Sequence, residues 1–283
     1  MDKRFKDYKV SKVISIETVH TAFSAHYDDD FKFLGERHDF WELVFVIDGN
    51  IGVSADASFF ELSSSDIIFH KPMELHTLTV PKGKKAHVLV ISFDCNSRAL
   101  SFFESGVFHL DRGSREELLK LNEYMESYLE NPYFDKPSGA FLAHWQSSEL
   151  YSQIFACRLE LLLLSIMDYS QRIRPKSNRE TVQFEQAAKL ISERLYASPT
   201  SYEIANEMNI SRSALDKLFA KYAGIGVHKY LTLMKIREAA RMIDEGVSLS
   251  AISEALNFGN RNYFSAVFKR EYGVSPSEYR KRQ

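Results

Sequence analysis

Two short polar helices near the C-terminus carry residue types suited to reading DNA bases. In residues 211–222 the apolar side chains recur at helical spacing and must face a core: Leu215, Leu218, Phe219 and Tyr222. The positions left outside are Arg212, Ser213, Asp216, Lys217 and Ala220. In residues 261–269 the outward positions are Arg261, Asn262, Ser265, Ala266 and Lys269. The DNA major groove admits one α-helix and presents donors and acceptors on its floor, so both segments suit recognition helices.

Each of these helices belongs to a duplicated unit of helix, tight turn and helix. Residues 204–230 read again as 252–279, with the apolar positions in phase at an offset of 48 before the turn and 49 after it. In the first unit, Thr200 and Glu203 have the spacing of a capping box that starts a helix over 201–208. Ser211 and Asn260 are placed to cap the two recognition helices.

A continuous helical pattern over 227–244 joins the units without a flexible spacer. A rigid connecting helix would hold the two recognition helices about one DNA turn apart, on the order of 34 Å, on one face of the duplex. Apolar spacing alone also allows a plain helical bundle with solvated outer faces. The duplication favours the DNA-binding interpretation.

The second unit resembles the DNA-binding domain of the AraC/XylS transcription regulators. The segment AISEALNFGNRNYFSAVFKREYGVSPSEYR follows that family's pattern, and the resemblance extends over residues 184–282. It implies base-reading roles for these residues: Ser213, Asp216, Lys217, Arg261, Asn262 and Ser265. Ala266 departs from the polar or basic residue common in the family, so the second helix would read fewer bases. Asn257 replaces the usual turn glycine and tolerates left-handed backbone.

Positive charge around these units predicts contacts with DNA phosphates. Residues 176–283 hold 17 Lys and Arg against 12 Asp and Glu, whereas residues 1–175 hold 19 against 26. A basic tail therefore follows an acidic body, as expected of a nucleic-acid footprint. We assign the phosphate contacts to Arg212, Lys221, Lys269, Arg270 and Arg280. Ser275, Pro276 and Glu278 start a last short helix close to them.

The N-terminal part reads as short strands. Apolar or alternating runs at 41–47, 58–62, 66–69, 76–80 and 87–93 are separated by turn signals at 48–50, 63–65, 71–72 and 81–83. This spacing predicts a sandwich or small barrel. The segments HDFWELVFVIDG and SSDIIFHKPMELH resemble the two motifs of a cupin barrel, the sensor commonly joined to this type of DNA-binding domain.

The cupin resemblance marks His38, Phe40, Glu42 and His76, because enzymatic cupins bind a metal at the matching positions. Phe40 cannot ligate a metal. Three interpretations remain: an open three-ligand metal site, the polar lining of an effector pocket, or residues satisfied within the barrel. We favour the effector pocket, and we expect neither a metal nor another cofactor. Trp41 and Phe45 point to the opposite side of the strand and are expected to pack against helices.

Two amphipathic helices, over 115–130 and 148–169, follow the barrel. We expect the second to form a homodimer, as the resemblance implies, against the alternative that both only complete the barrel core. The run QRIRPKSNR, at 171–179, reads as a linker. Residues 1–10 lack the apolar core of a secretion signal, and Cys95 and Cys157 are widely separated, so we expect a cytoplasmic protein with reduced thiols and no membrane contact.

The sequence thus predicts a two-domain α+β protein. Its parts are a cupin-like effector-sensing β-barrel (1–112), a helical dimerisation segment (113–170), a linker (171–181) and an all-α domain (182–283) with two helix-turn-helix units at about 200–222 and 249–271. We interpret it as an effector-responsive regulator that binds double-stranded DNA. The resemblance implies activation, with contact to RNA polymerase, and a small carbon compound such as a sugar as effector. The alternatives are a metal-dependent cupin enzyme fused to a DNA-binding tail, and a constitutive DNA-binding protein with a vestigial barrel.

Overall fold

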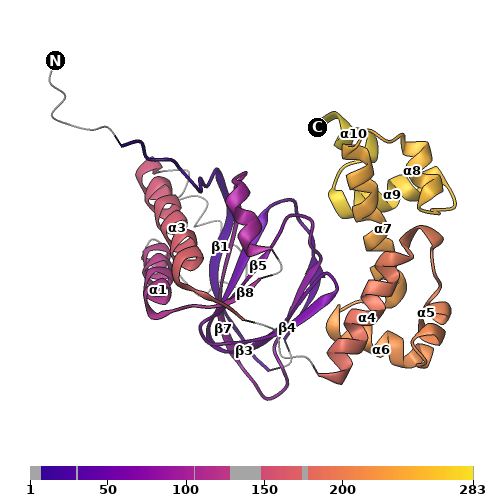
Figure 1. Cartoon of the computed structure of the whole chain (residues 1–283), viewed down its shortest axis with the longest axis horizontal. Helices are drawn as coiled ribbons and strands as arrows, with labels where there is room; N and C mark the ends of the chain where they lie inside the picture. Colours follow the sequence, from indigo (N-terminus) through magenta and orange to yellow (C-terminus); the bar gives the residue numbers. More distant parts are fainter. Residues whose placement is uncertain (1–7, 30, 105, 128–147, 174–177, 283) are drawn as a thin grey trace.

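The computed structural model describes residues 8–29, 31–104, 106–127, 148–173 and 178–282. Its first half is a β domain covered by helices on one side, and its second half is entirely helical (Figure 1). The strands are β1 (Thr18–Tyr27), β2 (Lys32–Glu36), β3 (Trp41–Ala55), β4 (Ser58–Ser63), β5 (Asp66–His70), β6 (His76–Thr79), β7 (Ala86–Asp94), β8 (Val107–His109) and β9 (Gln171–Ile173). The two-domain α+β architecture expected from the sequence is confirmed.

Strand β3 connects two antiparallel sheets. Its first half pairs with β5 and β7, and its second half pairs with β4 and β6. The strand order is β1-β7-β3-β5-β8-β9, while β6 joins β2 to β3. Strands β1 and β9 lie at the two ends of this order, so the expected cupin-like barrel is open and not closed.

The turn expected at residues 48–50 is instead a bend within β3. The pairing of β3 with β7 shifts register between Val46 and Asp48, and the chain continues as a strand to Ala55. Gly49 has a φ of 86°, and a Cβ atom there would lie 2.0 Å from the carbonyl oxygen of Lys85. Only glycine fits this position without rearrangement. The bend lets one strand serve both sheets.

Helices α1 (Arg112–Glu126) and α3 (Glu149–Tyr169) cover the outer face of the β5-β3-β7 sheet (Figure 1). Trp41 and Phe45 pack in the core between sheet and helices, as expected. Helix α1 begins three residues earlier than predicted because Asp111 caps it, accepting bonds from the amides of Gly113 and Ser114. The rest of the expected dimerisation segment, at 128–147, lies outside the described residues.

Helix α3 has a strongly apolar composition. By length and mean hydropathy, 1.5 over its most apolar window, it would be able to cross a membrane. Core helices of globular proteins meet the same criteria. Here one face is buried against α1 and the sheet: Tyr151, Phe155, Leu159, Leu162, Leu163 and Ile166. The opposite face leaves Leu150, Leu161, Leu164 and Tyr169 exposed.

Only part of the expected linker connects the domains. Residues 171–173 form β9, which extends the sheet by pairing with β8, and Arg179 already begins helix α4 (Arg179–Glu193). Asn178 caps that helix in a reciprocal box with Thr181. The polar composition that we interpreted as linker therefore covers a short edge strand and a helix start.

The helical domain contains two similar units around a central helix. Helices α5 (Ser201–Glu207) and α6 (Arg212–Tyr222) lie at one end of α7 (Val227–Asp244), and α8 (Leu249–Ala255), α9 (Arg261–Tyr272) and α10 (Pro276–Arg282) lie at the other (Figure 1). The Thr200 and Glu203 capping box is present, and Ser211 and Asn260 cap α6 and α9. These starts and the extent of α7 agree with the sequence prediction.

The two turns each contain an asparagine with a left-handed backbone at the matching position. Asn209 and Asn257 have φ values of 54° and 50°, in the left-handed region that asparagine tolerates. Asn257 also donates a side-chain hydrogen bond of 2.7 Å to the carbonyl oxygen of Tyr196. Replacement of the usual turn glycine is therefore accommodated.

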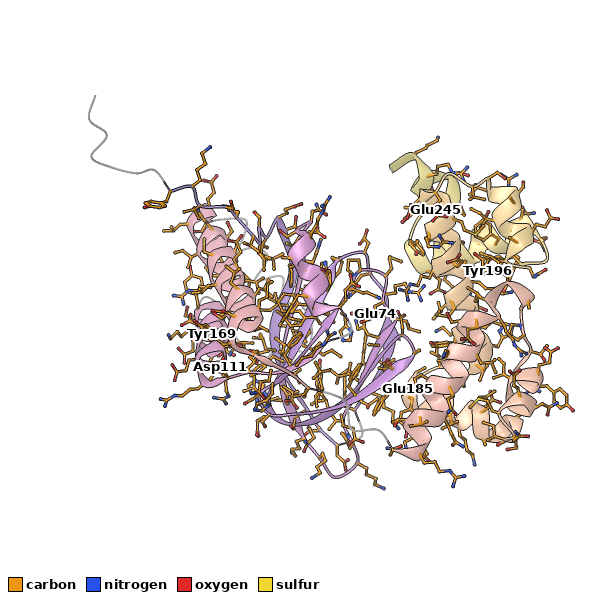
Figure 2. All side chains as sticks on the ribbon, viewed as in Figure 1. Glu74, Asp111, Tyr169, Glu185, Tyr196 and Glu245 are labelled. Carbon is orange, nitrogen blue, oxygen red and sulfur yellow. The ribbon has the colours of Figure 1, made fainter. Side chains whose placement is uncertain are left out.

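The β domain contacts the helical domain directly. Phe59 of β4 packs edge to face on Tyr222 of α6, with ring centroids 4.7 Å apart. Asp56 forms an ion pair with Arg237 of α7, and Arg37 Nη1 donates a 3.0 Å hydrogen bond to the carbonyl oxygen of Leu233. Figure 2 places Glu185 of α4 beside this boundary and Tyr169 on the far side of the β domain.

Candidate functional site

A cavity of about 760 Å³ lies between the two sheets of the β domain. Its apolar wall is mainly aromatic: Phe23, Tyr27, Phe31, Phe33 and Phe40. Its polar side chains include Glu36, His38, Glu42, His70, His76 and Ser92. No lysine or arginine stands among the described residues that line it. The volume and mixed lining are typical of a small-molecule site.

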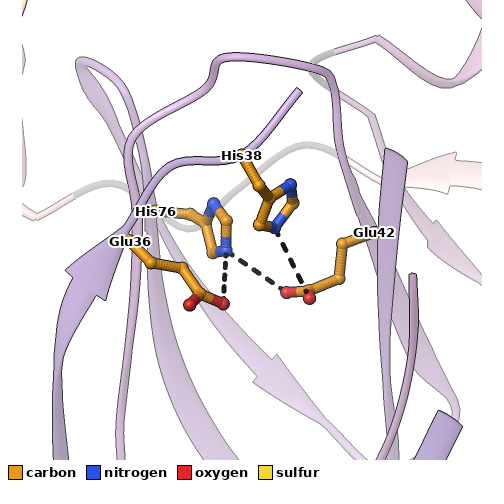
Figure 3. Close-up of side chains that lie close together, drawn as sticks. All are labelled: Glu36, His38, Glu42 and His76. Atoms are coloured by element: carbon orange, nitrogen blue, oxygen red, sulfur yellow. Dashed lines mark ion pairs between the residues drawn. The ribbon is translucent and has the colours of Figure 1, made fainter. Parts of the chain in front are cut away.

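Strand register brings the polar residues of the cavity together. Glu42 of β3 lies opposite His70 of β5 and Ser92 of β7, and Ser92 Oγ donates a 2.9 Å hydrogen bond to its carboxylate. His76 of β6 lies opposite Glu36 of β2. His38 comes from the segment between β2 and β3. Four side chains thus converge on one region of the cavity (Figure 3): Glu36, His38, Glu42 and His76.

The cluster places histidine nitrogens close to carboxylate oxygens. His76 Nε2 is 3.2 Å from a carboxylate oxygen of Glu42 and 3.8 Å from one of Glu36. His38 Nε2 is 3.6 Å from the other carboxylate oxygen of Glu42. Glu42 and His76 are buried, whereas the Glu36 side chain is 50% exposed and faces solvent at the cavity rim.

Both clustered histidines are oriented by backbone carbonyls. His38 Nδ1 lies 3.0 Å from the carbonyl oxygen of Phe40, and His76 Nδ1 lies 3.1 Å from that of Glu74. A carbonyl can only accept, so each Nδ1 carries a proton. Each Nε2 faces the carboxylates of the cluster.

Burial and ion pairing act against each other in this cluster. Burial disfavours the charged form of Glu42, but its interactions with His38 and His76 outweigh burial and hold its pKa well below the usual value. Burial likewise opposes protonation of His76, yet Glu36 and Glu42 raise its pKa to about 10. Burial, and then His76, lower the pKa of neighbouring His70. The cluster thus stabilises a positive charge at its centre.

The structure brings together three of the residues marked by the cupin resemblance, His38, Glu42 and His76, and adds Glu36 as a fourth. Phe40 lies on the cavity wall, with its ring stacked 3.9 Å from the His38 ring. His38 and Phe40 precede β3 and are not strand residues, contrary to our expectation. Glu36, which sequence reasoning missed, takes part in the cluster where Phe40 cannot. No local signal marked Glu36, because its place beside His76 depends on the pairing of β2 with β6.

The outward faces of the two recognition helices are free of core packing. Ser213, Lys217, Arg261 and Asn262 are exposed, and Asp216 and Ser265 are partly exposed. The inward residues of α6 and α9 are buried in separate hydrophobic cores. Each helix can therefore present its polar face to a ligand without unfolding.

The five cationic residues assigned to phosphates have different surroundings. Lys269 is exposed and no ion pair involves it among the described residues. Lys221 pairs with Glu180, Arg270 with Glu271, and Arg212 lies 3.9 Å from Asp216. The Arg280 guanidinium is partly buried and donates to the carbonyl oxygen of Val247. Lys269 is therefore available to a phosphate without breaking an ion pair of the described residues.

Family models match both domains. Residues 18–109 match the AraC-like ligand-binding domain, and residues 204–282 match a helix-turn-helix domain. The chain belongs to the AraC/XylS family of transcription regulators. The AraC-like ligand-binding match spans the strands that build the cavity, and the second match contains both recognition helices.

Similarity to individual AraC-type regulators is moderate. The transcriptional activator RhaR of Mannheimia succiniciproducens is 21% identical over 96% of this chain and 95% of its own. The Msm operon regulatory protein of Streptococcus mutans is 28% identical over 43% of this chain, and the chain spans only 45% of that relative. A solved structure of ToxT from Vibrio cholerae O395 aligns with 92% of this chain and 96% of its own at 14% identity, with a TM-score of 0.37.

Proposed function

We propose that this protein regulates transcription by binding DNA through α6 and α9 in response to an effector in the β-domain cavity. The observation that carries the proposal is the pair of recognition helices, each with an exposed polar face, mounted on the two ends of α7. Two such helices can enter successive major grooves on one face of a duplex. Similarity to regulators, among them one named for a raffinose operon, supports the same function rather than an enzyme.

Base reading falls to the six exposed or partly exposed residues already marked: Ser213, Asp216, Lys217, Arg261, Asn262 and Ser265. Arginine and asparagine form bidentate bonds with base edges, so Arg261 and Asn262 would supply most of the discrimination in α9. Lys269, with Arg212, Lys221, Arg270 and Arg280, would contact phosphates and add affinity without sequence preference. Arg280 would have to leave Val247 to do so.

The effector would bind among His38, Phe40, Glu42 and His76, in the cavity between the sheets. Segment 36–38 gives a route from this cavity to the DNA-binding domain. Glu36 and His38 face the cavity, whereas Arg37 between them bonds to Leu233 of α7. A ligand that moves segment 36–38 would therefore change the contact between Arg37 and α7. The difference in the ligand's affinity for the protein with and without this contact would set the size of the change in DNA binding.

The exposed apolar face of α3 is proposed as a homodimer interface, which would pair two DNA-binding domains on one operator. Names of relatives that refer to sugar operons and activation suggest a sugar or similar small carbon compound as effector. Activation would require contact with RNA polymerase. The protein would act in the cytoplasm.

Selection of binding sites from random duplex DNA by the full chain tests the proposal. We expect enriched sequences with two blocks about one helical turn apart. Arg261→Ala should weaken binding to the selected site by about 1–3 kcal/mol and relax one base pair. Lys269→Ala, the matched control on the same helix, should weaken all sequences alike and lower the salt slope by about one. Absence of enrichment, or equal effects of both variants on selected and random DNA, would refute base reading by α9.

A further inference from the structure

The cluster at the cavity has the properties of a metal site. Its four ligand atoms lie within 4.8 Å of one another, and they come from two imidazoles and two carboxylates. The sequence expectation of no metal counted only three ligands, since it placed Phe40 in the fourth position. The fold supplies Glu36 from β2 instead, outside the motif that the cupin resemblance marked.

The separations are close to those of a small four-coordinate ion. Ligands bound tetrahedrally at about 2.1 Å lie about 3.4 Å from one another. His76 Nε2 is 3.2 Å from one oxygen of Glu42 and 3.8 Å from Glu36, while His38 Nε2 is 3.6 Å from the other oxygen of Glu42. One donor atom from each of the four residues lies within 4.8 Å of the others, so inward rotation of the side chains would bring all four around one centre.

The histidines are prepared to act as ligands. Hydrogen bonds to the carbonyls of Phe40 and Glu74 hold a proton on each Nδ1, so both Nε2 atoms point at the carboxylates of the cluster. Two carboxylates gathered in one place repel each other unless positive charge lies between them. A bound cation would supply that charge. In metal sites, a hydrogen bond from the nitrogen that does not bind the metal fixes the tautomer of the histidine ligand, and the Nδ1 bonds described here have that form.

We propose that Glu36, His38, Glu42 and His76 bind a divalent transition-metal ion at one end of the cavity. Imidazole and carboxylate donors together suit Zn²⁺, Fe²⁺ or Mn²⁺. The ion would enter beside the half-exposed Glu36 side chain, whose carboxylate would then bind it from the solvent side. The cavity is far larger than an ion, so the metal leaves room for an organic effector beside it. The inference concerns the cavity that we propose as the effector site, and it does not depend on DNA binding.

Titration of the metal-stripped full chain with Zn²⁺ and Co²⁺ tests this site. We expect one ion per chain by calorimetry, and Co²⁺ should give the intense visible absorption of a four-coordinate ion, which Zn²⁺ displaces. Glu36→Gln should weaken Co²⁺ binding by about tenfold or more, and His76→Gln should abolish the four-coordinate spectrum. Melting curves of the stripped variants check that they fold.

His109→Gln is the matched control, because His109 forms a 2.8 Å pair with Asp66 outside the cluster. It should bind Co²⁺ as the unchanged protein does. The proposal is overturned if the stripped chain takes up no ion, if Co²⁺ shows only the weak spectrum of the six-coordinate hydrated ion, or if Glu36→Gln binds it unchanged. Binding of the selected DNA by the stripped chain is measured separately, so failure of either proposal is recognised independently.

Discussion

The two helix-turn-helix units share a sequence pattern but differ in what they pack against. The core of the first unit includes Phe59 and Leu75 from the β domain, whereas the core of the second is built only from helical-domain residues in the described part of the chain. The first unit therefore shares a hydrophobic core with the β domain. Glu271 and Tyr272 of α9 lie beside β-domain residues at two cavities of the boundary, but in the described part of the chain no shared hydrophobic core joins the second unit to the β domain.

Truncation of equivalent core residues should expose this difference most strongly. Phe219 and Phe268 occupy matching positions and are both fully buried, so Phe219→Ala and Phe268→Ala should each lower the free energy of unfolding of their unit by about 3–5 kcal/mol. The Phe219 ring packs on Phe184, which in turn contacts Tyr222 at the domain boundary. Urea denaturation and amide hydrogen exchange measure the two effects.

Only Phe219→Ala should also increase hydrogen exchange in β4, because Phe59 of that strand packs on Tyr222. Phe268→Ala is the matched control, because it removes the same side chain from the equivalent buried position of the second unit. If both substitutions raised exchange in β4 to the same extent, the conclusion that only the first unit shares a core with the β domain would be wrong.

Arg37→Ala should separate effector binding from the DNA response. A ligand found by thermal-shift screening should still stabilise this variant, because the Arg37 side chain points to α7 and away from the cavity residues. The change in DNA affinity caused by that ligand should fall by about 1–3 kcal/mol, the usual size of such coupling. Titration of labelled selected DNA with and without ligand gives both quantities. The exposed Arg98→Ala is the control, and a full response in Arg37→Ala would contradict the proposed route.

Removal of the helix caps should have the smallest effect and should be equal in the two units. Ser211 accepts a 3.1 Å bond from the amide of Ala214, and Asn260 accepts a 2.7 Å bond from that of Tyr263. Ser211→Ala and Asn260→Ala should each reduce stability by about 1 kcal/mol, measured by the urea midpoint. A markedly larger loss for Ser211→Ala would mean that the sensor contact depends on the exact start of α6.

The helical domain was more predictable than the β domain for a physical reason. Caps, apolar spacing and turns act within a few residues, so the starts of α5, α6, α7 and α9 follow from local sequence. Strand pairing joins distant segments, and the sequence analysis did not anticipate β1, β2, β8 or β9. The bend at Gly49 was mistaken for a turn because glycine signals positive φ without specifying which strands continue through it.

Local sequence by itself determined the recognition helices, their exposed polar faces and the stiff helix between them, since each depends on contacts within one or two helical turns. It also marked His38, Glu42 and His76. Only the tertiary structure decided that Glu36 joins them, because register between β2 and β6 is a long-range property. The same is true of Arg37 and Leu233, which are 196 residues apart and meet only when the two domains pack together.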